Sequence, residues 1–163
     1  MTSPFIRSLS SDPMRDSRAA ILVRVAVGAV FVASGTVKLL FENQGPGRFA
    51  HLGFPAPDVL SALVATVEIS AGALLMLGLT TRFAALPLIV DMCVAIATTK
   101  LSLLFGAGPE PVAAAPREGL WAFAYQARLD VTMLLGCAYF AIAGAGALSL
   151  DAMLARRIAS ARR

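Results

Sequence analysis

Two apolar runs joined by a short turn, each with one acid near its middle, constrain this chain more than any other feature. Residues 59–79 contain Glu68, and residues 83–105 contain Asp91. Each run is long enough to cross a membrane, because a hydrocarbon core of ~30 Å needs about 20 residues of helix. At ~1.5 Å per residue, each acid lies about 14 Å along its helix. Because the helices enter from opposite sides, we expect both acids near the midplane.

An acid at that depth needs a partner or a polar cavity. A charged side chain at the membrane centre costs ~2.5 kcal/mol or more on insertion scales. Ser61, Ala65 and Gly72 share a helical face with Glu68, which indicates that Glu68 points at other helices. Arg24, in the first apolar run, is the candidate cation.

The acids and Arg24 together form a candidate intramembrane polar site, for which two arrangements remain open. Like charges close together in a low-dielectric site cannot both ionise at low cost. Glu68 and Asp91 therefore either share a proton and polar contacts, or one of them engages Arg24. A purely structural role for the acids is a further interpretation.

Composition places the whole chain in the membrane class. Hydrophobic residues make up 58% and charged residues 15% of the 163 residues, whereas soluble domains carry about 25% charged residues. The net charge of +4 does not indicate nucleic acid, because the basic residues gather at the ends of apolar runs. The lipid bilayer is thus the first expected partner.

The apolar runs predict an all-α fold, an integral membrane four-helix bundle. We expect a polar N-terminal tail over residues 1–17, a membrane domain over 18–154 and a basic tail over 155–163. The expected spans are residues 19–41, 59–79, 83–105 and 126–148. With both termini on one side, that side holds nine lysines and arginines and the other holds five. The positive-inside rule then places both termini in the cytoplasm.

The first span carries a stripe of residues spaced three and four apart: Arg24, Gly28, Phe31, Gly35 and Lys38. Such spacing puts all of them on one helical face. Gly28 and Gly35, with Gly72 on the second span, predict close helix packing of the small-residue kind. Arg24 either faces inward or reaches the headgroups. For Lys38, at the end of the span, snorkelling to the headgroups is the preferred interpretation.

A second group of charges occupies one outer layer: Lys38, Lys100, Arg128 and Asp130. One interpretation is an interfacial cluster worth under about 1 kcal/mol per pair. The other is a ring of charges at the mouth of a cavity. No metal site is expected, since His51 stands alone in a loop and Cys93 and Cys137 have no ligand spacing.

Several motifs in order resemble the DoxX family over roughly residues 18–154. They are Arg24-x-x-x-Gly28, Gly35-Thr36-Val37-Lys38-Leu39, Gly53-Phe54-Pro55-Ala56-Pro57, Glu68 with Gly72, Leu77-Gly78-Leu79-Thr80-Thr81-Arg82 and Gly144-Ala145-Gly146-Ala147-Leu148-Ser149-Leu150-Asp151. The chain departs from closer relatives at the start of the fourth span. Their His-Glu-x-Arg-x-Asp is here Tyr125-Gln126-Ala127-Arg128-Leu129-Asp130, which keeps the Arg and Asp but lacks the titratable His and Glu.

The resemblance implies a multi-pass protein of the bacterial plasma (inner) membrane. It suggests a membrane subunit or scaffold of a redox-linked complex related to quinone, thiol or sulfur chemistry and oxidative stress, rather than a stand-alone enzyme. No cofactor motif is evident in the residues themselves, and a quinone is the ligand that the resemblance suggests. A redox protein and further copies of the chain are the implied partners. The alternative is a small transporter or channel component that uses Glu68 and Asp91 as a proton or ion relay.

The expected topology is open to a direct test. Reporter fusions after Arg163 and within residues 113–117 should report opposite sides of the membrane, because both termini are expected in the cytoplasm and the long loops outside. Paired alkaline phosphatase and fluorescent protein fusions measure this. An external signal from the C-terminal fusion contradicts the topology.

Overall fold

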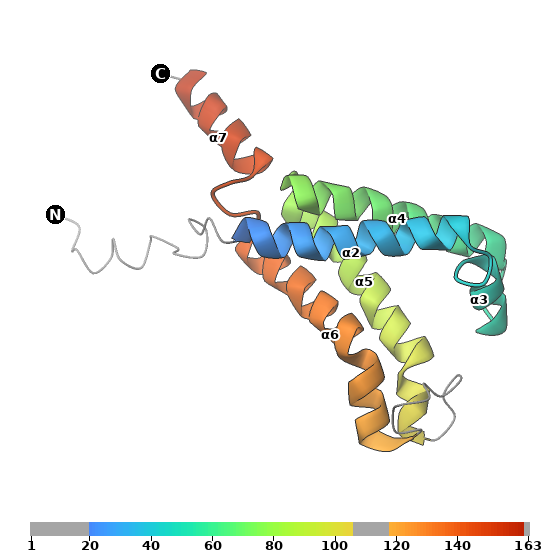
Figure 1. Cartoon of the computed structure of the whole chain (residues 1–163). Helices are drawn as coiled ribbons and strands as arrows, with labels where there is room; N and C mark the ends of the chain where they lie inside the picture. Colours follow the sequence, from blue (N-terminus) through green and yellow to red (C-terminus); the bar gives the residue numbers. More distant parts are fainter. Residues whose placement is uncertain (1–19, 106–117, 162–163) are drawn as a thin grey trace.

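The computed structural model describes residues 20–105 and 118–161, and within them the chain is all-helical, as predicted (Figure 1). The expected N-terminal tail lies outside the described residues. The elements are α2 (Ala20–Leu40), α3 (Pro46–His51), α4 (Pro57–Leu77), α5 (Thr81–Thr99), the 3-10 helix η1 (Leu101–Phe105), α6 (Gly119–Ala143) and α7 (Leu150–Ala161).

Three of the helical segments are long and apolar enough to cross a membrane: Ala20–Leu40, Pro57–Leu77 and Thr81–Phe105. The fourth expected span, residues 126–148, falls on α6, which begins and ends earlier in the chain. Its aromatic start is helical, and it stops before Gly144, whose φ of 82° suits a residue without a side chain. α6 is a continuous helix but is not one of these three segments, so a fourth span remains a prediction.

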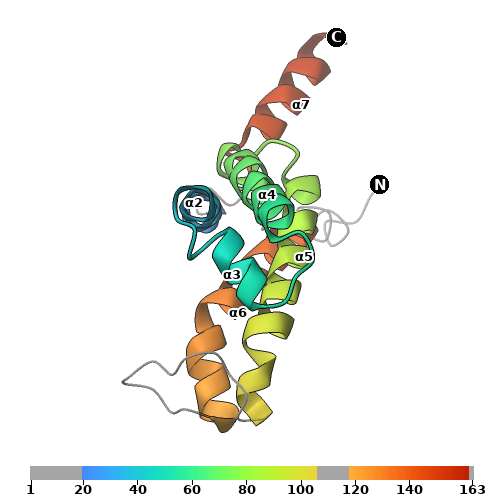
Figure 2. The same ribbon diagram turned by 90° about the vertical axis from the view of Figure 1, so that its right-hand side faces the viewer.

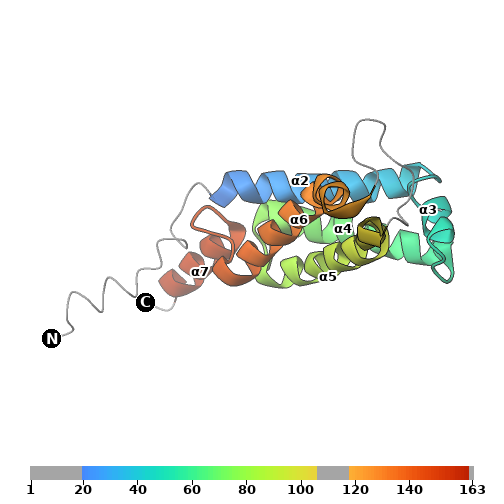
Figure 3. The ribbon, with the colours of Figure 1, turned by 90° about the horizontal axis from the view of Figure 1, so that it is seen from below.

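The long helices form two antiparallel pairs that meet at one end and diverge at the other. α2 packs along α4, and α5 packs along α6. In Figure 1 the α5–α6 pair descends away from α2 and α4, and Figure 2 shows the same divergence from the side. The short α3 lies at the far end of the first pair, which Figure 3 shows from below. We call the converging end the closed end.

Glycines set the distance between α2 and α4. A Cβ atom added to Gly28 would lie 2.6 Å from the carbonyl oxygen of Gly72, and one added to Gly35 would lie 2.7 Å from that of Ala65. Both distances are shorter than real Cβ contacts. The two backbones therefore touch directly, which gives the helices extensive van der Waals contact without a hydrophobic driving force.

A packed core fills the closed end. Its buried side chains come from all four long helices: Val27, Phe31, Ala71, Leu75, Ala84, Ala85, Leu88, Met92, Met133, Cys137 and Phe140. Cys93, in contrast, is exposed. The core fixes the two pairs relative to each other.

The α4–α5 turn is capped from a distant part of the chain. α4 ends at Gly78, whose φ of 69° is left-handed, and its N–H bonds back to the carbonyls of Leu74 and Leu75. Thr80 and Thr81 begin α5, and their N–H groups donate to the carboxylate of Asp151 at 2.8 and 3.2 Å. A carboxylate satisfies the free N–H groups at a helix start and complements the helix dipole. The first turn of α7 is thereby tied to the closed end.

Close packing at Gly28 predicts a large effect of added volume. Gly28→Leu should lower the stability of the detergent-solubilised protein by about 1–3 kcal/mol or more, because overpacking forces backbones apart. Ala26→Leu is the matched control, since Ala26 is an exposed residue of the same helix. Thermal unfolding in mild detergent measures both. Equal losses in the two variants contradict direct contact between α2 and α4.

Candidate functional site

A cavity of about 910 Å³ lies between the diverging helix pairs. Its walls are largely apolar and come from both pairs, with Leu63 and Val67 on α4 and Val90 and Val94 on α5. This volume lies within the ~300–1,000 Å³ range of small-molecule sites. The charged side chains that line the cavity fall into two groups.

An ion pair lies at the inner end of the cavity. The Nζ atom of Lys38 is 2.6 Å from Oε2 of Glu68. Glu68 is only 1% exposed, and the Lys38 side chain is 20% exposed. The expectation that Lys38 snorkels to the headgroups is wrong. A carboxylate removed from water attracts a cation strongly, and the long lysine stem allows Lys38 to reach back from the end of α2.

Asp91 and Asp130 extend this pair into a cluster. The Asp91 carboxyl lies near enough to Glu68, Lys38 and Asp130 for all three to influence it electrostatically. All four side chains line the cavity, and we call them the inner cluster. Glu68 and Asp91 thus line one cavity, and their matching depth in a membrane stays a prediction. The inner cluster holds three carboxyl groups and one ammonium group.

Two residues that line the cavity each hold an unsatisfied polar atom. Oδ2 of Asp91 and Nε2 of Gln126 are buried without a hydrogen-bond partner among the described residues, and both residues line the cavity. Buried polar groups nearly always have partners, so each exception calls for an explanation. Here one atom is an acceptor and the other is a donor.

Sequence reasoning did not select Gln126 as a site residue. The available signal was its spacing, because Gln126 lies four residues before Asp130 and thus on the same helical face. Gln126 stands out because its Nε2 atom is buried, and the sequence pattern did not indicate that burial.

Arg24 does not belong to this site, so of the two arrangements left open by the sequence, the one in which an acid engages Arg24 is not found. Its side chain lies at the closed end and is 2% exposed. It donates to the carbonyl oxygens of Met76 at 3.3 Å, of Leu148 at 2.7 Å and of Ala145. These carbonyls are near the end of α4 and in the α6–α7 link, where helical hydrogen bonding stops. Free carbonyls at helix ends carry partial negative charge and therefore satisfy the guanidinium.

Three more cations, which we call the mouth cations, line the cavity: the exposed Arg48 and Arg128 and the half-buried Lys100. Arg128 donates to the Tyr125 carbonyl and stands 4.0 Å from the centre of the Tyr125 ring. The expected outer group of Lys38, Lys100, Arg128 and Asp130 thus lines one cavity, but Lys38 and Asp130 belong to its inner cluster.

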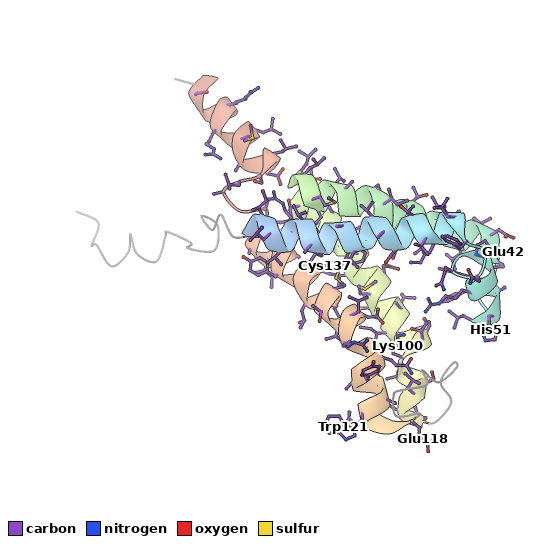
Figure 4. The ribbon with its side chains drawn as sticks, in the orientation of Figure 1. Glu42, His51, Lys100, Glu118, Trp121 and Cys137 are labelled. Carbon is purple, nitrogen blue, oxygen red and sulfur yellow. The ribbon has the colours of Figure 1, made fainter. Side chains whose placement is uncertain are left out.

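The remaining polar residues show no metal chemistry in the described ranges. His51 is exposed on α3, away from Lys100 in Figure 4. Residues 20–105 and 118–161 contain no group of three or more His, Cys, Asp or Glu side chains placed to hold a metal ion.

Comparison with known proteins gives a consistent match. The DoxX family model matches residues 19–101. An uncharacterized membrane protein of Mycobacterium tuberculosis, Rv3486, is 44% identical over 138 residues, which cover 84% of this chain and 82% of that protein. No solved structure matches the chain.

The Lys38–Glu68 pair predicts a specific pattern of stability. Lys38→Met should destabilise the protein by about 3–5 kcal/mol at neutral pH, because it leaves a buried carboxylate unpaired. The loss should shrink as the pH falls, since protonation of Glu68 removes the unpaired charge. Thermal unfolding in detergent at several pH values measures this.

Two controls accompany that measurement. Lys100→Met removes a cation that has no ion-pair partner among the described residues, so its effect should be small. The double variant Lys38→Met/Glu68→Gln should recover much of the stability, because no buried charge remains. A double variant as unstable as Lys38→Met contradicts the pair.

Proposed function

Because the chain belongs to the DoxX family of multi-pass membrane proteins, we propose that it is an integral membrane subunit of a redox-linked complex whose cavity receives the head group of a quinone. The proposal is carried by two residues that line a largely apolar cavity, Asp91 and Gln126, because each holds a buried polar atom, Oδ2 and Nε2, without a hydrogen-bond partner among the described residues. The protein acts as a subunit beside a redox partner rather than as a stand-alone enzyme.

The hydrogen-bonding chemistry of a quinone fits these two atoms. A quinone carbonyl accepts a hydrogen bond, which the Gln126 amide supplies, and a quinol hydroxyl donates one, which the Asp91 carboxylate accepts. Conversion of quinone to quinol takes two electrons and two protons. The redox partner supplies the electrons, and the carboxyl groups of the inner cluster hold and pass the protons. The apolar walls suit the ring and the start of the isoprenoid tail.

The proposal includes a membrane arrangement. Residues 18–154 form a four-helix membrane domain in which α6 is the fourth span, and both termini are cytoplasmic. The hydrogen bonds from Arg24 to Ala145 and Leu148 support this arrangement, because they hold the start of α2 beside the end of α6. The excess of basic residues in the two tails then orients this end toward the cytoplasm.

A relay of protons or ions across the membrane has less support. Such a path would continue from the inner cluster to the closed end, where fully buried Phe31, Leu88 and Phe140 are packed together. Lys38 also pairs directly with Glu68, the first acid of the relay. The cavity is thus better suited to binding a ligand than to conducting protons or ions.

Quinone retention tests the proposal. The intact membrane complex is extracted in mild detergent, and bound ubiquinone and menaquinone are quantified after organic extraction. Gln126→Leu and Asp91→Leu should each lower retention about tenfold, because a hydrogen bond is worth about 1–1.5 kcal/mol. Thr132→Val is the matched control, since Thr132 is exposed on α6. Full retention by the Gln126→Leu and Asp91→Leu variants, or no quinone with the parent protein, overturns the proposal.

A further inference from the structure

The mouth cations come from both helix pairs. Arg48 lies on α3, which packs against α4, whereas Lys100 follows α5 and Arg128 lies on α6. Figure 4 shows Lys100 on the descending α5–α6 pair, with α3 at the end of the other pair. All three residues line the same cavity. An anion bound by all three cations would therefore contact both helix pairs.

Their charge is not neutralised within the described part of the chain. The ion pair between Lys38 and Glu68 is the only one found there. Arg48 donates from Nη1 to the neutral amide of Gln44 at 3.3 Å, and Arg128 donates from Nη1 to a backbone carbonyl. A guanidinium group has five N–H donors. Each arginine thus retains donors for a planar oxyanion or phosphate, which arginine binds well.

The walls next to the mouth suit an apolar chain. Leu63, Val90 and Val94 line the cavity and are 56%, 62% and 44% exposed. Phe49 and Phe54, with ring centroids 5.4 Å apart, also line it near α3. The cavity lining thus combines cations with apolar side chains, as the phosphate and the acyl chains of a phospholipid require.

The inner cluster limits how far into the cavity an anion can bind. Its carboxyl groups, Glu68, Asp91 and Asp130, outnumber its single ammonium group. A phosphate is therefore repelled from the inner end and attracted to the mouth. A free anion would satisfy the cations but would leave the apolar walls uncovered, whereas a lipid satisfies both.

We propose that Arg48, Lys100 and Arg128 bind the phosphate of an anionic phospholipid, whose acyl chains lie along the walls formed by α4 and α5. The lipid joins the two helix pairs across the mouth. This inference rests on the cavity and its charges and not on quinone chemistry.

Native mass spectrometry of the delipidated protein tests the site. The probes are dioleoylphosphatidylglycerol, dioleoylphosphatidylcholine and inorganic phosphate, each titrated separately. The parent protein should bind phosphatidylglycerol at least tenfold more tightly than phosphatidylcholine. Lys100→Gln/Arg128→Gln should remove that preference, and Lys100→Arg/Arg128→Lys should largely restore it, because charge is kept.

The matched control removes the same charge elsewhere. Arg156→Gln/Arg157→Gln changes two exposed cations of α7 and should leave phosphatidylglycerol binding unchanged. Equal losses in both double variants mean non-specific attraction and overturn the proposal, as does equal affinity of the parent for the two lipids. Inorganic phosphate that competes fully at millimolar concentration indicates a free-anion site and overturns it too. Quinone retention, measured in the intact complex before delipidation, reports separately on the proposed function.

Discussion

The burial of Arg24 is the interaction on which the rest of the structure depends. A guanidinium in a membrane interior is tolerated only when its donors find acceptors. Its three acceptors belong to Met76, Ala145 and Leu148, so one side chain joins α2, the end of α4 and the α6–α7 link. The cap that Asp151 provides to α5 adds the remaining long helix to the same end. The closed end is therefore held by partnered polar groups, although Oγ1 of Thr81 is buried there without a hydrogen-bond partner among the described residues.

At the other end of the molecule, some charged and polar groups lack partners among the described residues. There the long side chains of α3, α5 and α6 carry charge without ion-pair partners in the described ranges, and two buried polar atoms have no hydrogen bond. The contrast follows from packing. Glycines at 28, 35 and 72 bring α2 and α4 together, but α5 and α6 pair with each other as they leave the core. The residues that hold the unsatisfied atoms then line one cavity between the two pairs.

The sequence alone predicted the helical class, three of the spans and the inward orientation of Glu68. These depend on local length and periodicity, and the small residues around Glu68 were a sufficient signal. The partners of the charged residues were predicted poorly. Arg24 binds carbonyls released where helices end, and residue types do not reveal those acceptors. Lys38 reaches Glu68 because its stem can turn inward, a choice that periodicity does not determine. Gln126 gains its role from burial alone. The fourth span, the tails and the sidedness of the termini remain predictions.

The left-handed turn at Gly78 connects three positions that are far apart in the chain. A Cβ atom there would lie 2.6 Å from Nη1 of Arg24 and 2.6 Å from Cβ of Ser149. A side chain at position 78 would thus displace the guanidinium from its carbonyls as well as strain the backbone. Evolution can alter this corner only by changing several residues together. Among relatives, positions 24, 78 and 149 should therefore covary, and a homologue without glycine at 78 should also lack the arginine.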